Sequence, residues 1–123
     1  MRVKMFMATA AIAISGVFAS GAAAAGKAET KVTIKGGGEV YGYVKSDDPA
    51  NCSEGRKVTV FIQVGARGGG NDEKVGSDNA SQSGDRYQWS IGNPGVQGEQ
   101  IYAKARPTPE CKADTSKTVL VPA

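Results

Sequence analysis

Apolar and polar residues alternate in short segments from residue 31 to the end of the chain. A period of two is typical of β-strands that bury one face, and these segments are rich in valine, isoleucine, threonine and aromatic residues. Glycine, proline, asparagine and serine lie between them, as expected for turns. The pattern predicts strands at 31–35, 40–45, 57–63, 73–78, 86–91, 100–106 and 117–121.

The same alternation selects the side chains that share a buried face. Seven short strands with turn signals between them are the number expected for an immunoglobulin-like sandwich. The sequence therefore predicts an all-β, seven-stranded β-sandwich in which Trp89 anchors the core. The expected core is Val32, Ile34, Val40, Val44, Val58, Val60, Ile62, Val75, Tyr87, Trp89, Ile91, Ile101, Ala103, Ala105, Val119 and Val121.

Residues 1–25 have the three-part pattern of a secretory signal peptide. A basic start at Arg2 and Lys4 precedes an apolar stretch, which ends in small residues at 20–25. We expect cleavage near the end of this run, so that residues 26–123 form one secreted or periplasmic domain without stable membrane insertion. The alternative is an uncleaved anchor, because the apolar stretch is roughly long enough to span a bilayer. The alanine-rich leader is typical of bacterial export.

The charge of the chain changes when this leader is removed. The 15 basic residues lose Arg2 and Lys4 and become 13 against 12 acidic residues, which leaves a net charge of +1. A nucleic-acid-binding domain is expected to keep a basic surplus on its folded part, because neutralising phosphates dominates such affinity. We therefore expect no nucleic-acid partner, and nothing in the sequence demands a cofactor or more than a monomer.

The chain contains two cysteines, Cys52 and Cys111, in loops before the third and after the sixth predicted strand. In an oxidising compartment such a pair is expected to form a disulfide. Closing a loop between cysteines 59 positions apart stabilises a domain by about 4 kcal/mol in the chain-entropy model. That is a large fraction of the net stability of a small domain.

Several short motifs carry a resemblance to a known family. They are Gly42-Tyr43-Val44, Val58-Thr59-Val60, Ser77-Asp78, Ser83-Gly84, Tyr87-Gln88-Trp89 and Gly98 followed by 101–105. In this order they resemble the carboxypeptidase regulatory-like, transthyretin-like group of β-sandwich modules. The resemblance covers about two-thirds of residues 26–123 and implies a non-catalytic accessory or surface role. The enzymatic branch of the transthyretin-like fold uses histidines, and this chain has none.

The absence of histidine also removes the base or ligand of Ser-His-Asp catalysis, Cys-His catalysis and His-ligated zinc. The remaining carboxylate pairs lie in or beside polar loops, where acids usually bond nearby backbone amides. We expect no catalytic residue and no enzyme. A weak calcium candidate is formed by Asp78 and Asp85, which flank Asn79, Ser81 and Ser83. Their spacing does not match an EF-hand loop.

Tyrosines are the one feature with potential for binding. Tyr41 and Tyr43 fall opposite Val40 and Val44, and Tyr102 falls opposite its apolar neighbours, so all three are expected on the outer face of a sheet. Exposed tyrosines can stack on sugars or anchor a protein. They can also be ordinary cross-strand pairs or part of a second core face.

The sequence therefore predicts a secreted, non-catalytic module with a structural or protein-interaction role. The alternative is a carbohydrate or small-ligand binding module that uses the three tyrosines, so the partner is an unidentified protein or glycan. A second alternative is a protease inhibitor that presents 106–109 or 65–70 as a rigid loop, since preorganisation lowers the entropic cost of binding.

Overall fold

The structure is a computed structural model that describes residues 26–123. The predicted signal peptide, residues 1–25, lies outside the described residues. Within the described part, no helix is both long and apolar enough to cross a membrane. Ten strands and one short helix make up the fold. They are β1 (Thr30–Val32), β2 (Lys35–Gly36), β3 (Val40–Ser46), α1 (Pro49–Cys52), β4 (Lys57–Ile62), β5 (Glu73–Asn79), β6 (Ser81–Ser83), β7 (Arg86–Gly92), β8 (Gln100–Ala105), β9 (Asp114–Thr115) and β10 (Val119–Leu120).

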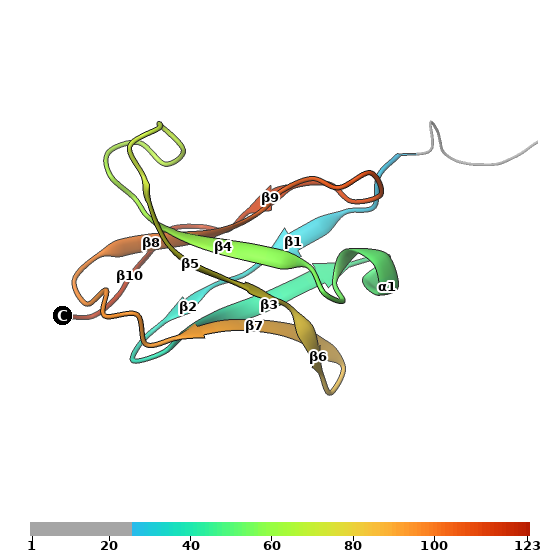
Figure 1. Ribbon diagram of the computed structural model, residues 1–123, viewed down its shortest axis with the longest axis horizontal. Coiled ribbons are helices and arrows are strands. Elements are labelled where there is room, and N and C mark those ends of the chain that lie inside the picture. The colour runs from blue at the N-terminus through green and yellow to red at the C-terminus, as the bar shows by residue number, and fades with distance from the viewer. Residues whose placement is uncertain (1–25) are drawn as a thin grey trace, which may run out of the picture.

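The strands form two antiparallel sheets that pack as a sandwich (Figure 1). The first sheet has the order β1-β3-β7-β6, and β2 also pairs with β3. The second sheet has the order β10-β8-β4-β5, and β9 also pairs with β8. The β5 strand runs on into β6 across the single residue Ala80. The chain therefore changes sheets at this corner.

Each of the seven predicted segments contains a strand, so the all-β prediction is confirmed. Three details differ. The first segment is divided into β1 and β2, while β6 and β9 were not predicted. The loop expected before the third strand contains α1, whose last residue is Cys52. Only four residues form this helix, which is too short for a helical hydrophobic period to be recognised.

The division of the first strand has a steric cause at Gly42. A Cβ placed on Gly42 would lie 1.8 Å from the carbonyl oxygen of Thr33 and 2.9 Å from Cζ2 of Trp89. The backbone of Thr33 therefore approaches β3 more closely than any residue with a side chain would permit. The amide of Thr33 still donates to the carbonyl of Tyr43 at 3.0 Å. In the other direction, the amide of Tyr43 donates to the Thr33 hydroxyl at 3.1 Å, so a side-chain bond takes the place of a second main-chain bond.

The core is the one that the alternation predicts. Eleven of the sixteen expected residues belong to the buried hydrophobic cluster between the sheets, with Trp89 completely buried. The other five are partly buried and pack against it: Ile62, Val75, Tyr87, Ile91 and Val119. Two further buried members are Ala80 and Val96. Both lie outside regular alternation: Ala80 is the link between β5 and β6, and Val96 is in the loop before β8.

Candidate functional site

The outer face of the first sheet carries basic and tyrosine side chains. Its five strands contain four cations and no aspartate or glutamate. The alternation along β3 places two tyrosines on the same side as these cations, because Gly42 and Val44 between them face the core. We call this surface the tyrosine–lysine face, and its residues are Lys31, Lys35, Tyr41, Tyr43, Lys45 and Arg86.

Two lysines of the tyrosine–lysine face oppose each other directly. Lys31 on β1 is in register with Lys45 on β3, and both side chains are exposed. Like charges at directly opposite positions of a sheet are destabilising. Among residues 26–123 the one salt bridge joins Lys112 to Glu29, so no carboxylate of the described chain pairs with either lysine. The sheet thus holds an unneutralised pair of charges.

The tyrosines form a cluster with Arg86. The rings of Tyr41 and Tyr43 have centroids 6.2 Å apart and meet edge to face at 87°. The Arg86 guanidinium lies 4.7 Å from the centroid of Tyr43, as in a cation–π contact. Both tyrosines are half-buried. Their predicted position on the outer face is confirmed, and one face of the Tyr43 ring is covered by a cation.

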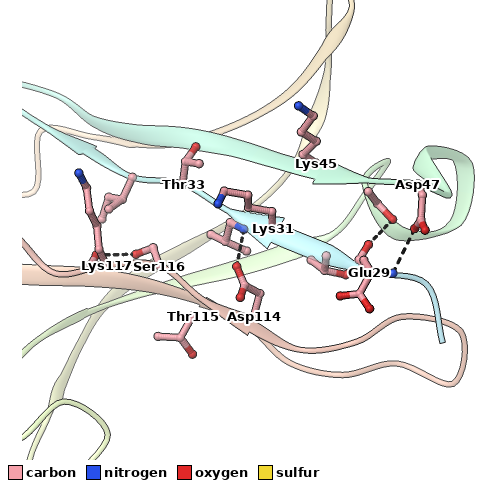
Figure 2. Close-up of a pocket in the computed structure, with 13 residues that line it drawn as sticks. Glu29, Lys31, Thr33, Lys45, Asp47, Asp114, Thr115, Ser116 and Lys117 are labelled. Carbon is pink, nitrogen blue, oxygen red and sulfur yellow. Dashed lines mark hydrogen bonds between the residues drawn. The ribbon is translucent and has the colours of Figure 1, made fainter. Parts of the chain in front are cut away.

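A groove of about 840 Å³ runs beside this face, between β1, β3 and the segment from β9 to 117 (Figure 2). Lys31 and Lys45 line it from the first sheet, and Lys117 lines it from the chain before β10. The groove is also lined by three acids, Glu29, Asp47 and Asp114, so its lining has mixed charge.

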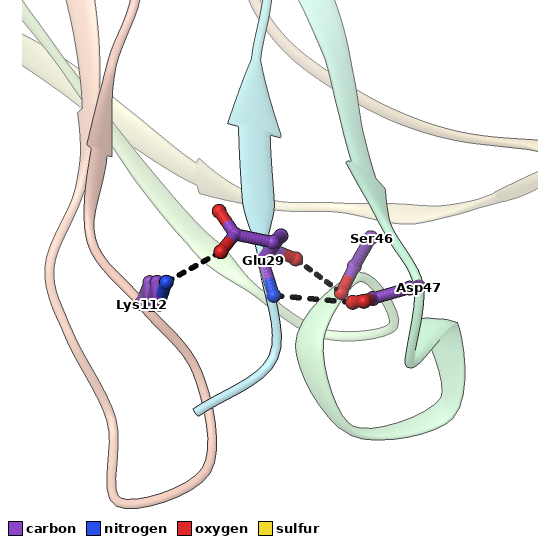
Figure 3. Close-up of polar contacts among 4 residues, drawn as sticks. All are labelled: Glu29, Ser46, Asp47 and Lys112. Carbon is purple, nitrogen blue, oxygen red and sulfur yellow. Dashed lines mark hydrogen bonds and ion pairs between the residues drawn. The ribbon is translucent and has the colours of Figure 1, made fainter. Parts of the chain in front are cut away.

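The acids that line the groove are bonded within the protein. The Asp114 carboxylate accepts a hydrogen bond from the amide of Val32 at 2.7 Å. This bond satisfies an amide on the edge of β1 that faces away from β3. The Asp47 carboxylate accepts one from the amide of Glu29 at 3.1 Å. The Glu29 carboxylate pairs with Lys112 (Figure 3). These bonds fasten the fold, and none of the three acids forms a salt bridge with a lysine of the tyrosine–lysine face. Because the donors to Asp47 and Asp114 are neutral amides, these two carboxylates still offset part of the positive charge along the groove.

The predicted disulfide between Cys52 and Cys111 is present, with Cα atoms 5.6 Å apart. It joins the end of α1 to the loop after β8. The same loop pairs with the start of the described chain, because Ala28 donates to the carbonyl of Glu110 and accepts from the amide of Lys112, each at 2.9 Å. The disulfide and these bonds hold three distant segments at one end of the sandwich.

Arg56 lies beneath the disulfide and is only 5% exposed. Its Nη1 donates to the Thr30 hydroxyl at 3.1 Å and to the Cys52 carbonyl at 3.0 Å. Its Nη2 donates to the carbonyls of Arg106 and Lys112, each at 2.8 Å. Desolvation by burial lowers the pKa of this guanidinium. The group acts as a structural connector whose partners are all neutral.

Tyr102 lies on the outer face of the second sheet, but the expectation that it is exposed is wrong. The side chain is 3% exposed and its ring stacks on Phe61 at a centroid distance of 5.5 Å. The Tyr102 hydroxyl donates to the Asp72 carboxylate. That carboxylate also accepts from the amides of Val64 and Gly68, each at 2.8 Å. The loop between β4 and β5 is thereby folded over the ring.

These contacts move two pKa values in opposite directions. The pKa of Asp72 is lowered, first by the hydrogen bond from Tyr102 and then by the two backbone amides. The pKa of Tyr102 is raised, first by burial and then by its bond to Asp72. Both shifts favour a neutral phenol on a charged carboxylate. Tyr102 thus forms a hydrogen-bonded contact with Asp72 that holds the loop between β4 and β5. It is separated from Tyr41 and Tyr43 by the thickness of the sandwich.

The two aspartates of the weak calcium candidate, Asp78 and Asp85, have different surroundings. The Asp78 carboxylate accepts a hydrogen bond from the amide of Ser90 at 2.8 Å, across the corner between β5 and β7. Asp85 is exposed in the turn between β6 and β7. Within residues 26–123, no three carboxylate, histidine or cysteine side chains converge as metal ligands would.

The sequence interpretation found the tyrosines of this site but missed its cations. The signal was present, because Lys45 follows Tyr43 at the same strand period and the lysines at 31 and 35 have the same spacing from the core positions 32 and 34. The net charge of +1 on residues 26–123 does not reveal them, because acids elsewhere in the chain balance these cations. No known family model matches the chain, and no curated protein is similar enough in sequence to indicate a relationship.

Proposed function

We propose that this protein is an exported, non-catalytic binding module that holds an extracytoplasmic partner on its tyrosine–lysine face. The observation that carries the proposal is the pair Lys31 and Lys45, which oppose each other on a sheet without an acid. The repulsion between the two lysines lowers the stability of the unbound protein, and this repulsion is relieved when an anionic partner binds. The edge-to-face tyrosines beside the pair supply a rigid, amphipathic contact surface.

We also propose that the sandwich is immunoglobulin-like. An immunoglobulin constant-type domain has sheets with the strands ABED and CFG. The order β1-β3-β7-β6 is consistent with ABED when β1 is taken as strand A, and the order β10-β8-β4-β5 is consistent with GFC extended by one further strand, β5. The resemblance to the carboxypeptidase regulatory-like group rests on turn glycines and core aromatics. The strand order is a separate observation, and it supports the immunoglobulin-like proposal.

Export is supported by the disulfide and by the leader pattern of residues 1–25. Intact-mass analysis of the protein from culture, with and without reductant and alkylation, tests it. A chain that begins near Gly26 and takes up two alkyl groups only after reduction is the expected result. A full-length mass, or two thiols that react without reductant, would contradict export to an oxidising compartment.

Binding is tested by cosedimentation of the processed protein with cell-envelope material of the producing organism. The double variant K31Q/K45Q removes the opposed lysines, and K57Q/K104Q removes the same charge from exposed positions on the second sheet. We expect the wild type and K57Q/K104Q to sediment with the envelope and K31Q/K45Q to stay in solution. Absence of wild-type sedimentation, or equal behaviour of the two variants, contradicts the proposal.

The protease-inhibitor alternative retains one favourable observation. The loop after β8 is braced by the disulfide and by two bonds between the main chains of Thr108 and Cys111, at 3.0 and 3.3 Å. Arg106 at its start has an exposed side chain of the type that a trypsin-like enzyme recognises, although Pro107 follows it and its carbonyl is bonded to Arg56. Unchanged trypsin turnover in the presence of the protein would exclude this alternative.

A further inference from the structure

We infer that the partner of the tyrosine–lysine face is an acidic polysaccharide, whose carboxylates bind the lysines and whose hydroxyl groups bind beside Tyr41 and Tyr43. This inference rests on the proposed function above and names the ligand of the same surface. Three features of the face lead to it: the spacing of its charges, the geometry of its aromatic rings and its neutral polar side chains.

The spacing of the charges favours an extended ligand over a small anion. Opposed side chains on neighbouring strands have Cβ atoms about 5 Å apart, so one carboxylate can contact both Lys31 and Lys45. Arg86 lines the same recess as Lys31 and Lys45. The most distant cation, Lys35, is opposite Tyr41, four residues along β3 from Lys45. At about 3.3 Å per residue these positions are roughly 13 Å apart. A single small anion cannot reach both, whereas a chain with repeated anionic groups can.

The ring geometry argues against nucleic acid as that polymer. Proteins that bind single strands stack bases on open aromatic faces. Here Tyr41 presents its ring at 87° to Tyr43, and the Arg86 guanidinium covers a face of Tyr43. A base could stack on Tyr43 from that side only after displacing Arg86. On the side that Arg86 covers, the Tyr43 ring therefore offers its edge and hydroxyl group, which suit a ligand rich in hydroxyls.

Neutral polar groups complete the surface. Gln88 and Ser90 of β7 are in register with Tyr43 and Tyr41, and Thr33 lines a recess of about 510 Å³ together with Lys31, Tyr43, Lys45 and Arg86. Asp85 is the acid at the rim of this recess. Amide and hydroxyl side chains can donate to and accept from sugar hydroxyls. Charged, aromatic and neutral groups are therefore arranged side by side, as an acidic sugar polymer would need.

The experiment is a calorimetric titration of the processed protein with galacturonate oligomers. Their methyl-esterified form is the control for charge, since esterification removes the carboxylates and keeps the chain. Single-stranded poly(dT) is the control for general polyanion binding. We expect galacturonate to bind more tightly than poly(dT), the ester to lose binding, and added salt to weaken it. Equal binding of the ester, or tighter binding of poly(dT), would overturn the inference.

The variants locate the site. K31Q/K45Q removes two exposed charge contacts, so we expect an affinity loss of about tenfold, with a urea midpoint at or above that of wild type because the repulsion is removed. K57Q/K104Q should bind galacturonate as wild type does. An equal loss in both variants would overturn the inference. Envelope cosedimentation that depends on Lys31 and Lys45, without galacturonate binding, would refute the polysaccharide and leave the proposed function standing.

Discussion

Replacing Arg56 tests whether a planar group of donors, rather than a positive charge, holds the disulfide end together. Its guanidinium is buried and donates four hydrogen bonds to neutral oxygens from three segments: β1, the end of α1 and the loop after β8. Arg56→Met keeps the apolar stem and removes all four bonds. Arg56→Lys keeps the charge but has a single nitrogen with three donors in place of the planar group.

The expected magnitudes follow from those bonds. Hydrogen bonds to a charged group are worth about 1.5–3 kcal/mol each, so the gross loss in Arg56→Met is at least about 6 kcal/mol. Removing the charge returns several kcal/mol of desolvation penalty, which leaves a net loss of about 3 kcal/mol. In Arg56→Lys the penalty remains while one or more bonds are lost. The loss of one or two bonds at about 1.5–3 kcal/mol each is similar in size to the net loss in Arg56→Met, so we expect the two variants to be destabilised to a similar extent.

Urea unfolding of the oxidised protein measures both variants. With a slope of about 1–1.5 kcal/mol/M for a domain of this size, a loss of about 3 kcal/mol lowers the midpoint by roughly 2–3 M. Arg106→Met is the matched control, because the Arg106 side chain is exposed, and its effect should stay within about 0.5 kcal/mol. A lysine variant as stable as wild type would show that charge alone suffices and would refute the reasoning.

Three further outcomes follow from the fold. Gly42→Ala should lower the unfolding free energy by about 3 kcal/mol, the upper end for overpacking, because the clashing atom at 1.8 Å is the rigid backbone oxygen of Thr33. Gly37→Ala, whose Cβ would meet nothing within 4 Å, should leave the urea midpoint nearly unchanged, and equal effects would contradict the steric argument. Reducing the disulfide should cost about 4 kcal/mol, and an unchanged midpoint in reductant would contradict that entropic contribution. The lowered pKa of Asp72 stabilises the fold above about pH 4, and this stability is lost as pH falls through the folded value. The raised pKa of Tyr102 stabilises the fold below about pH 10, and this stability is lost as pH rises through the folded value. Asp72→Asn should therefore flatten the acid side of a plot of urea midpoint against pH. An unaltered acid side would contradict a stabilising contact between Tyr102 and Asp72.

Alternation predicted the sheets and the core well because it reports a property that each strand has by itself. Val58 and Val60, or Trp89 and Ile91, face inward whichever strand lies beside them. The prediction failed where a residue's environment depends on a distant segment. Tyr102 was assigned to the correct face, but its burial depends on Asp72, which is 30 residues away in sequence. No local period carries that information.

The division of the first strand is a second case of distant control. Residues 31–35 alternate without interruption in sequence, yet Gly42 lets the backbone at Thr33 approach closely and break the ladder between β1 and β2. A glycine within a strand is a general signal for close backbone approach. It does not identify the partner, which only the pairing of β3 with β1 supplies.

Net charge failed as a guide to binding for a different reason, since a sum does not record arrangement. The strands of the second sheet carry Lys57, Lys74 and Lys104 together with Glu73, Asp78 and Asp114, whereas those of the first carry only cations. Opposed lysines cost a sheet roughly 0.2–1 kcal/mol, so the fold gains nothing from this separation. Local charge on one face, judged with the same period of two that identifies the core, is therefore the better sequence indicator of binding. Applied to β1, β2 and β3, it marks the lysines and tyrosines as one surface.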